Sequence, residues 1–529
     1  ARPVTDLLIH DARILDGTGR PAFPGAVAVR SDRIERLILP GEPEPPAHRR
    51  LDARGLLVTP GFVDVHDHSD LSPFVEPWMD SMLRQGVTTV VVGNCGSSAV
   101  PFAGADELAA WTGRSPEDLG QRWTSFSGYR EAVQAARPAV NLAALVGHGS
   151  LRLEVMGDVS RIPTTDEMAR MRGLLADAVE EGAVGLSTGL IYRPGIHATT
   201  QEIQELAAVL RDTGALYASH IRGEGQPVFE AIGECIGIGR TAGVPAHVSH
   251  LKLETSLVWG RTADLLGTID RARAAGDDVS ADQYPYAAWE SALSSLLPPW
   301  APPDALPDLL GDPRTAARLI RSVEQGEPGW QSSVRGVGWE RLVVVAHAGA
   351  PGLTGRTLAD IGAATGRSPA EATFDLLMID PETSVIGHAM HEDDVRAIVA
   401  REDVMVATDG VAVSPTGPMG RFHLHPRCYG TFPRVLARYV RREGVLSLTA
   451  AVRKMTSLPA ERFGLRDRGV VRTGAFADLV ILDPATVEDR ATYEAPHAFP
   501  DGIETVIVNG RIAWKGRRVE RAGRALRRG

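Results

Sequence analysis

The feature that most constrains the fold of this 529-residue chain is a regular alternation, in its middle, of short apolar stretches with helical ones. Each apolar stretch has the length of a β-strand and ends in polar residues. Alternation of this kind predicts parallel strands joined by crossover helices. Eight such strands are predicted, ending at or near His66, Gly93, Gly147, Ser187, Ser219, Ser249, Asp282 and Thr408. Eight βα units predict an α/β fold of the TIM-type (β/α)8 barrel class. Capping boxes at Thr164 with Glu167, and at Thr199 with Glu202, mark the starts of two helices.

Two further stretches have strand character and leave the strand count open. They are 342–345, followed by His347, and 385–387, followed by His388, and either could belong to the barrel. The segment 289–338 breaks the alternation and contains a proline-rich cluster between Leu297 and Pro303. We expect this segment to be an insertion over the barrel mouth, acting as a lid.

The two ends of the chain resemble each other more than they resemble the middle. Both are rich in short strands and turns, and Asn509-Gly510 is a strong signal for a type I′ hairpin turn. We therefore expect a small β-sandwich built from residues 1–58 and 466–529, flanking a barrel of residues 59–465. The basic tail from Lys515 to Arg528 is interpreted as a solvated terminus.

Composition restricts the partners. A net charge of −10 disfavours nucleic acid and anionic membranes as partners, and no apolar run is long enough to span a bilayer. The first residues lack the apolar core of a signal peptide. Cys95, Cys235 and Cys428 are too few for a disulfide framework and suit a reducing compartment. These features predict a cytoplasmic protein without nucleic-acid or membrane partners.

The predicted strand ends carry side chains that bind metals. His66 and His68 are two residues apart, so in a strand both imidazoles lie on one face. Other strand ends supply Cys95, His220, His250 and Asp409. Each alone has an ordinary explanation, since cysteine is often a small buried hydrophobe and histidine a hydrogen-bonded core residue. Together, at the end of a barrel where catalytic groups gather, they predict a zinc site.

Several blocks of sequence resemble a known family. His66-Asp67-His68, Gly93-Asn94-Cys95-Gly96, the block from Ser219 to Glu224, the block from His247 to Lys252, Tyr284-Pro285-Tyr286 and the block from His425 to Arg434 are similar to those of N-acyl-D-amino acid deacylases, or D-aminoacylases, in the amidohydrolase superfamily. The resemblance covers nearly the whole chain. Asp67 and Leu251 depart from the family pattern.

The resemblance implies both the metal site and the reaction. Cys95, His220 and His250 are expected to hold a tightly bound zinc, and His66, His68 and Asp409 a second, weaker one, with Cys95 shared. The implied reaction is zinc-dependent hydrolysis of N-acyl-D-amino acids to a carboxylic acid and a free D-amino acid. Metal-bound hydroxide is the expected nucleophile, and Asp409 the general base and acid.

The substrate contacts are predicted from residue chemistry. Lys252 and Tyr192 are expected to bind the substrate carboxylate, and Tyr284 and Tyr286 to contribute further contacts. Arg193 and Arg222 are weaker candidates, since strand-end arginines often pair with acids such as Glu224. The predicted lid supplies Leu293, Leu296, Leu297 and Trp300, which favour apolar D side chains over acidic ones.

Three other functions fit parts of the pattern. A hydantoinase or dihydroorotase, which acts on cyclic amides, shares the paired histidines but bridges its metals with a carboxylated lysine. A deaminase of the superfamily does not suit the Cys95 block. A non-catalytic protein on the same fold typically lacks the ligands that this chain retains. The sequence leaves the oligomeric state open.

Overall fold

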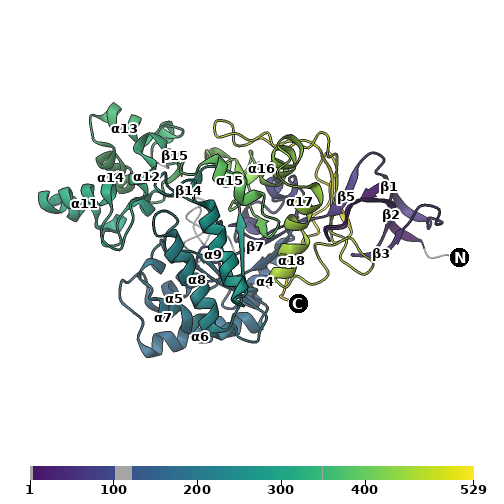
Figure 1. Ribbon diagram of the computed structural model, residues 1–529, viewed down its shortest axis with the longest axis horizontal. Coiled ribbons are helices and arrows are strands. Elements are labelled where there is room, and N and C mark those ends of the chain that lie inside the picture. The colour runs from purple at the N-terminus through teal and green to yellow at the C-terminus, as the bar shows by residue number, and fades with distance from the viewer. Residues whose placement is uncertain (1–3, 102–121, 348) are drawn as a thin grey trace.

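The computed structural model of the protein describes residues 4–101, 122–347 and 349–529. Figure 1 shows a β-rich region at one end, a central α/β region, and a mainly helical region at the opposite end. Within the described residues, no helix is long and apolar enough to cross a membrane.

The β-rich region combines the two ends of the chain in one sheet. Its strand order is β20-β19-β18-β5-β1-β2-β3, and β4 pairs with β1. The strands are β1 (Thr5–Ile14), β2 (Phe23–Arg30), β3 (Arg33–Ile38), β4 (Ala47–Asp52), β5 (Leu57–Pro60), β18 (Leu479–Leu482), β19 (Ile503–Val508) and β20 (Arg511–Trp514). The two ends meet where β5 pairs antiparallel with β18. Asn509 and Gly510 both have positive φ, at 48° and 76°, which confirms the predicted turn between β19 and β20.

The central region contains the parallel strands, and each of the eight predicted strands is present. They are β6 (Phe62–Asp64), β7 (Val87–Val92), β8 (Asn141–Ala144) continued by β9 (Val146–Gly147), β10 (Gly185–Gly189), β11 (Leu216–His220), β12 (Ala246–Val248), β13 (Val279–Gln283) and β17 (Val404–Val406). They form two parallel sheets, β6-β7-β8 and β17-β13-β12-β11-β10-β9. All residues of β7, β10, β11 and β13 are buried, as expected for parallel strands covered on both faces.

Two short links join these sheets. Leu145 alone separates β8 from β9 along the chain. At the other edge, a parallel bridge pairs Asp67 with Gly410, just beyond β6 and β17. The backbone N–H of Asp409 donates to the carbonyl of His66 at 2.8 Å, and that of His68 to the carbonyl of Gly410 at 2.8 Å. The first and last of the parallel strands are therefore neighbours at their carboxyl ends.

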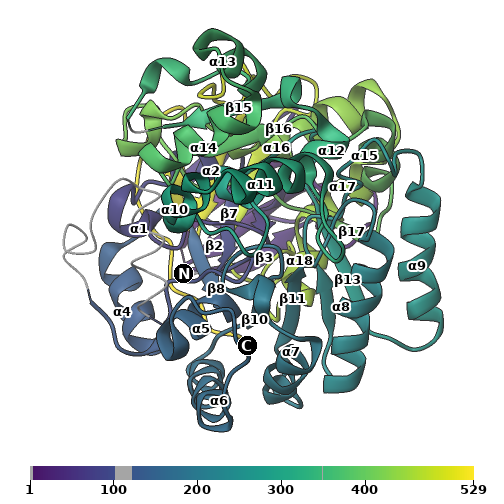
Figure 2. The same ribbon diagram turned by 90° about the vertical axis from the view of Figure 1, so that its left-hand side faces the viewer.

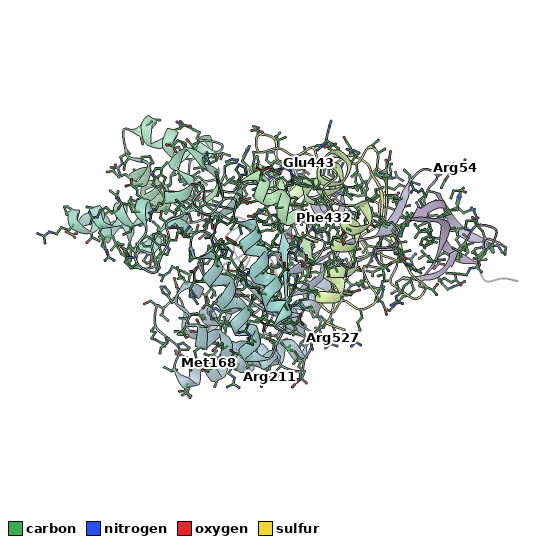
Figure 3. All side chains as sticks on the ribbon, in the orientation of Figure 1. Arg54, Met168, Arg211, Phe432, Glu443 and Arg527 are labelled. Atoms are coloured by element: carbon green, nitrogen blue, oxygen red, sulfur yellow. The ribbon has the colours of Figure 1, made fainter. Side chains whose placement is uncertain are left out.

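Helices surround the parallel strands, as Figure 2 shows for α5 to α9. The helices of this region are α1 (Ser72–Val75), α2 (Asp80–Leu83), α4 (Phe126–Ala136), α5 (His148–Met156), α6 (Thr165–Glu180), α7 (Thr200–Ala207), α8 (Val228–Ala242), α9 (Thr262–Ala274), α15 (Glu392–Val399), α16 (Arg427–Arg434), its π-helical continuation η9 (Val435–Arg442), α17 (Leu448–Met455) and α18 (Ser457–Arg462). Phe432, near the middle of the molecule in Figure 3, stacks on Phe62 with ring centroids 5.4 Å apart.

Only one of the two predicted capping boxes is complete. Thr164 and Glu167 exchange both hydrogen bonds at the start of α6. At the start of α7, Thr199 accepts from the backbone of Glu202 as predicted. The Glu202 carboxylate instead binds the buried Arg152, at 2.7 and 2.8 Å, and His148, at 2.8 Å. The Glu202 carboxylate thus binds the buried Arg152 in place of the backbone N–H of Thr199 that would complete the capping box.

The insertion is longer than the sequence pattern indicates. It starts at β14 (Trp289–Ala292) and runs through α10 (Leu306–Gly311), α11 (Pro313–Gln325), α12 (Ser333–Val337), β15 (Leu342–Ala346), α13 (Leu358–Thr365), α14 (Pro369–Ile379) and β16 (Ser384–Gly387). These three strands form an antiparallel sheet of their own in the order β14-β16-β15. Both surplus strands therefore belong to the insertion, which has a separate apolar core.

The basic tail is not a solvated terminus, so that interpretation was wrong. Residues after β20 run back along the central region, where Leu142 of β8 donates to the carbonyl of Arg524 at 2.9 Å and accepts from Leu526 at 2.7 Å. Arg524 pairs with Asp32 at 2.6 Å, and Arg518 pairs with Asp80. Backbone pairing and ion pairs with the buried Asp80 and the half-buried Asp32, neither visible in composition, fix the tail.

Candidate metal centre and active site

The carboxyl ends of the parallel strands bring the predicted ligands together. His66 and His68 follow β6, Cys95 follows β7, His220 ends β11, His250 follows β12 and Asp409 follows β17. Three of these residues have left-handed backbone, with φ of 52° at Cys95, 36° at His250 and 49° at Asp409. Non-glycine residues in that region are strained and concentrate at functional sites. The turns after the strands thus aim these side chains at one point.

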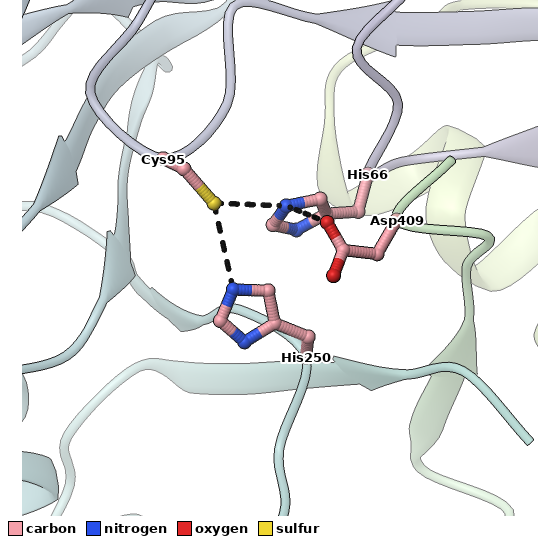
Figure 4. Close-up of side chains that lie close together, drawn as sticks. All are labelled: His66, Cys95, His250 and Asp409. Atoms are coloured by element: carbon pink, nitrogen blue, oxygen red, sulfur yellow. Dashed lines mark hydrogen bonds and ion pairs between the residues drawn. The ribbon is translucent and has the colours of Figure 1, made fainter. Parts of the chain in front are cut away.

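Cys95 contacts three of the histidines. Its Sγ is 3.2 Å from Nε2 of His66 and 3.4 Å from Nε2 of His250, as Figure 4 shows. It is also 3.7 Å from Nδ1 of His220. Asp409 Oδ1 is 3.1 Å from Nε2 of His68 and 3.3 Å from Nε2 of His66. One ligand atom from each of His66, Cys95, His250 and Asp409 lies within 4.8 Å of the others. All six predicted ligands converge.

The charges of the cluster suit a cation. Burial alone raises the pKa of the Cys95 thiol, but His66 and His250 hold it well below its ordinary value. Burial likewise opposes ionisation of Asp409, yet Arg427 and His66 hold its pKa well below the usual range. A thiolate, imidazoles and a carboxylate are the donors that zinc prefers, and the ligand must be deprotonated. The residues present therefore fit zinc.

Glu224 contacts two of these histidines, His220 and His250. Its position in the sequence does not reveal this role. Its Oε1 is 2.9 Å from Nδ1 of His250, and its carboxylate is 3.5 Å from Nε2 of His220. The ammonium of Lys252 lies 2.5 Å from the same carboxylate. Glu224 does not pair with Arg222, which instead contacts Glu234 at 2.9 Å. Ligand atoms of His220, Glu224 and His250 also lie within 4.8 Å of one another, so Glu224 contacts the proposed ligands directly while it pairs with Lys252.

The residues predicted to bind substrate are placed differently from one another. Tyr192, Lys252 and Tyr284 line a cavity of about 710 Å³ that also contains the ligand cluster. Nζ of Lys252 is already bonded to Glu224 and to the carbonyl of His250, at 3.0 Å. Tyr286 is not among the lining residues, since its ring lies edge-on to His425 in the core of the insertion. Arg193 lines the cavity but pairs with Asp158 at 2.9 Å.

Arg427 is the functional candidate that residue-by-residue reasoning missed. It is 5% exposed, lines the cavity, and donates from Nη1 to Oδ2 of Asp409 at 2.7 Å. Its Nε has no hydrogen-bond partner among the described residues, nor do the hydroxyl of Tyr284 and Nε1 of Trp289. All three residues line the cavity, and the three groups are donors. Unmet buried donors beside a cavity favour an anionic ligand group there. The sequence signal that could have identified Arg427 is the block from His425 to Arg434, which resembles the family but was assigned no role.

The insertion supplies much of the remaining wall. Leu297, Pro298, Pro299 and Ala301 line the cavity. Of the other residues predicted there, Leu293 and Leu296 are buried in the core of the insertion, and Trp300 packs against that core. The insertion therefore lines the cavity through one of the four predicted side chains, Leu297, and through the proline cluster after it.

Comparisons with known proteins show the family to which the chain belongs. The sequence model described as the amidohydrolase family matches residues 49–513. An N-acyl-D-glutamate deacylase of Alcaligenes xylosoxydans xylosoxydans is 40% identical, over 99% of this chain and 96% of the relative. A D-aminoacylase of the same organism is 37% identical, over 99% and 98%. The solved N-acyl-D-glutamate deacylase of Bordetella bronchiseptica, complexed with zinc and a phosphonate inhibitor, is 36% identical, with a TM-score of 0.83 over 99% of this chain and 100% of that one. A dihydropyrimidinase of Brevibacillus agri, 14% identical with a TM-score of 0.57, shares the fold alone.

Proposed function

The chain belongs to the amidohydrolase family, and we propose that it hydrolyses the amide bond of N-acyl-D-amino acids with the help of zinc. The products are a carboxylic acid and a free D-amino acid. The observation that carries the proposal is Cys95, whose Sγ lies between His66, His220 and His250.

We also propose that the two parallel sheets close into one eight-stranded barrel, because β8 and β9 are nearly continuous and Asp67 bridges Gly410.

A hydantoinase-like activity is disfavoured by the lysines. The chain contains only Lys252, Lys454 and Lys515. Lys252 is bonded to Glu224, and Lys454 donates to the carbonyls of Val399 and Arg401 at 2.6 and 2.7 Å. Lys515 follows β20, far along the chain from any ligand. The position between the two ligand sets is taken by the Cys95 thiolate, so no bridging lysine is needed.

We assign the ligands as follows. Cys95, His220 and His250 would hold the tightly bound zinc, and His66, His68 and Asp409 a second, weaker position that shares Cys95. When bound, zinc supplies a Lewis acid toward the acyl carbonyl and toward water. The protein must contribute the rest, namely proton transfer, orientation and exclusion of solvent.

Asp409 is the group that moves the proton. Its carboxylate is ionised because Arg427 and His66 stabilise the charge, so it can accept a proton from the attacking water. It can then return the proton to the amine nitrogen, which is a poor leaving group until protonated. Arg427, bonded to Oδ2 at 2.7 Å, fixes the orientation of the carboxylate throughout.

The substrate carboxylate has a better partner than Lys252. Both cations are paired with an acid, Lys252 with Glu224 and Arg427 with Asp409. Arg427 nevertheless keeps a donor, Nε, without a partner among the described residues, and so does the hydroxyl of Tyr284. The Arg427 guanidinium carbon lies 4.9 Å from the centre of the Tyr284 ring. We propose that these two donors bind the α-carboxylate, while Lys252 and Tyr192 contact the substrate nearer the metal ligands.

The same arrangement implies selection of one enantiomer and of apolar side chains. With the amide at the metal ligands and the carboxylate at Arg427, only inversion at the α-carbon exchanges the side chain with the hydrogen. The relatives that act on D-substrates support the D hand. The wall contributed by Ile191, Leu297 and Pro298 is apolar, which supports a preference for apolar side chains.

The test is a panel of N-acetyl-D- and N-acetyl-L-leucine, methionine, glutamate and aspartate, assayed for free amine with and without added zinc. We expect D-leucine and D-methionine derivatives to be hydrolysed fastest and chelation to abolish turnover. Faster L than D turnover contradicts the proposed activity. Faster turnover of the D-glutamate derivative contradicts only the side-chain preference.

The proposal concerns a small-molecule substrate. The thiols of Cys95, Cys235 and Cys428 are all free, which supports a reducing compartment such as the cytoplasm.

A further inference from the structure

Asp282 lies buried beneath the ligand cluster, at the end of a strand that supplies none of the six ligands. Asp282 follows Ala281 in β13, and its side chain is fully buried. Three separate groups converge on its two oxygens, and two of them belong to proposed metal ligands.

One oxygen of Asp282 holds the backbone of His250. Oδ1 accepts the His250 N–H at 2.8 Å. His250 has a φ of 36°, a strained conformation that persists only where its surroundings enforce it. The His250 side chain points from this strained backbone toward Cys95, with its Nε2 3.4 Å from Sγ. The hydrogen bond therefore fixes the direction in which His250 points.

The other oxygen lies between two imidazoles. Oδ2 is 2.7 Å from Nε2 of His247, a hydrogen-bonding distance. It is 3.6 Å from Nδ1 of His66, which has no hydrogen-bond partner among the described residues, so this second interaction is electrostatic. His247 is itself held, with its Nδ1 2.7 Å from the hydroxyl of Ser280 and its ring against Phe463. The Asp282 carboxylate cannot rotate away from His66 without breaking these contacts.

We infer that Asp282 is a positioning residue that sets the tautomer of His66 and the direction of His250 for metal binding. Nε2 of His66 faces Cys95 and Asp409, so it needs a free lone pair to bind a cation. The ring proton must then sit on Nδ1, where the negative charge of Asp282 stabilises it. The inference rests on the metal centre of the proposed function.

Asp282→Asn is the decisive variant. It keeps the shape of the side chain but replaces one acceptor oxygen by a hydrogen-bond donor, the amide NH₂. The amide oxygen can still accept the His250 N–H, but the amide NH₂ then faces His66 and favours the proton on Nε2. We expect the weaker metal position to lose about 10- to 100-fold in affinity, the usual effect of removing a partner of a metal ligand. The tight position should change by less than about threefold, since the His250 contact survives.

The matched control is Asp478→Asn. Asp478 is also buried, pairs with Arg468 and accepts the N–H of Asn509 at 2.7 Å, but it lies at the β-rich sheet. Both variants should lower the melting temperature. Only Asp282→Asn should shift the chelator-competition curve for zinc and, in cobalt-loaded protein, the absorption of the weaker position.

The inference is overturned if both zinc affinities of folded Asp282→Asn match the parent, or if Asp478→Asn shifts them equally. If Asp282→Asn does not fold, His247→Asn frees the same carboxylate and should weaken the same position by about threefold or more. An unchanged affinity there also overturns it. Failure of the parent to bind zinc at all contradicts the proposed function instead.

Discussion

Replacing Arg427 by methionine separates the two candidate partners of the substrate carboxylate. A hydrogen bond to a charged group contributes about 1.5–3 kcal/mol, so its loss should lower kcat/KM about 10- to 150-fold. This loss should appear with N-acetyl-D-leucine and be absent with its amidated analogue, N-acetyl-D-leucinamide, which has no carboxylate. Both substrates will share any common loss from the disturbed Asp409, which is bonded to Arg427 at 2.7 Å. The acid-to-amide ratio is therefore the quantity to measure.

Lys252→Met is the competing variant. Its Nζ is 2.5 Å from Glu224, so its removal leaves the buried carboxylate without its ammonium partner and disturbs His250, which contacts the same carboxylate. We expect lower activity on acid and amide alike, with their ratio changed by less than about threefold, a free-energy difference below about 1 kcal/mol. A selective loss on the acid in Lys252→Met, with equal losses in Arg427→Met, refutes the proposed anchor and supports Lys252.

Arg434→Met is the matched control for stability. Arg434 is also largely buried over a tyrosine, with its guanidinium 4.6 Å from the Tyr286 ring, and pairs with Asp489 at 2.9 Å. It is not among the residues that line the cavity. Breaking either buried pair should cost about 3–5 kcal/mol of unfolding free energy, measured by urea denaturation. Arg434→Met should leave the acid-to-amide ratio unchanged.

Three further predictions concern the metal, the proton and pH. Cys95→Ala, His220→Ala or His250→Ala should each remove zinc and activity together in purified protein, and near-normal zinc content in all three contradicts the ligand assignment. Asp409→Asn should keep the tight zinc but lower kcat by about 10²–10⁴, and turnover within a few-fold of the parent places the proton transfer elsewhere. Burial raises the pKa of Glu76 from 4.5 to about 7, so the stability it contributes is complete below pH 4.5 and is lost as pH rises through 7. Glu76→Gln should therefore exceed the parent by about 1–3 kcal/mol in urea denaturation at pH 8 and match it at pH 4.5, and equal stability at both pH values contradicts that shift.

The parallel strands and the cluster of candidate ligands at their ends could be predicted because both signals are local. An apolar run such as Val87–Val92 followed by a polar turn marks a buried strand and its carboxyl end. The fold then gathers every such end at one face, so Cys95 and His250 could be placed together without knowing any distance between them. The Asn509-Gly510 turn is equally local.

The insertion could not be delimited because strand pairing is not local. Leu342–Ala346 and Ser384–Gly387 have the apolar composition of barrel strands. What distinguishes them is an antiparallel pairing with each other and with β14, which composition does not encode.

The roles of Glu224, Asp282 and Arg427 were missed for a similar reason. A charged residue has the same appearance in a sequence whether it is solvated or buried. Glu224 was expected to pair with its near neighbour Arg222, but its partner is Lys252, which follows the adjacent strand β12. Only the fold shows that these charges lie against the metal ligands.

The pairing of β5 with β18 has a consequence for the synthesis of this protein. Thr59 of β5 pairs with Val480 of β18. During translation, about 420 more residues must therefore be made after β5 before β18 can pair with it. At about 5–20 residues per second, the wait lasts roughly 20–85 s. During that time the edge of β5, with its apolar Leu57 and Val58, is open to pairing with other nascent chains. The yield of folded protein in a cell should therefore depend on chaperones that cover this edge on the ribosome, and on translation speed, more than on the final stability of the sheet.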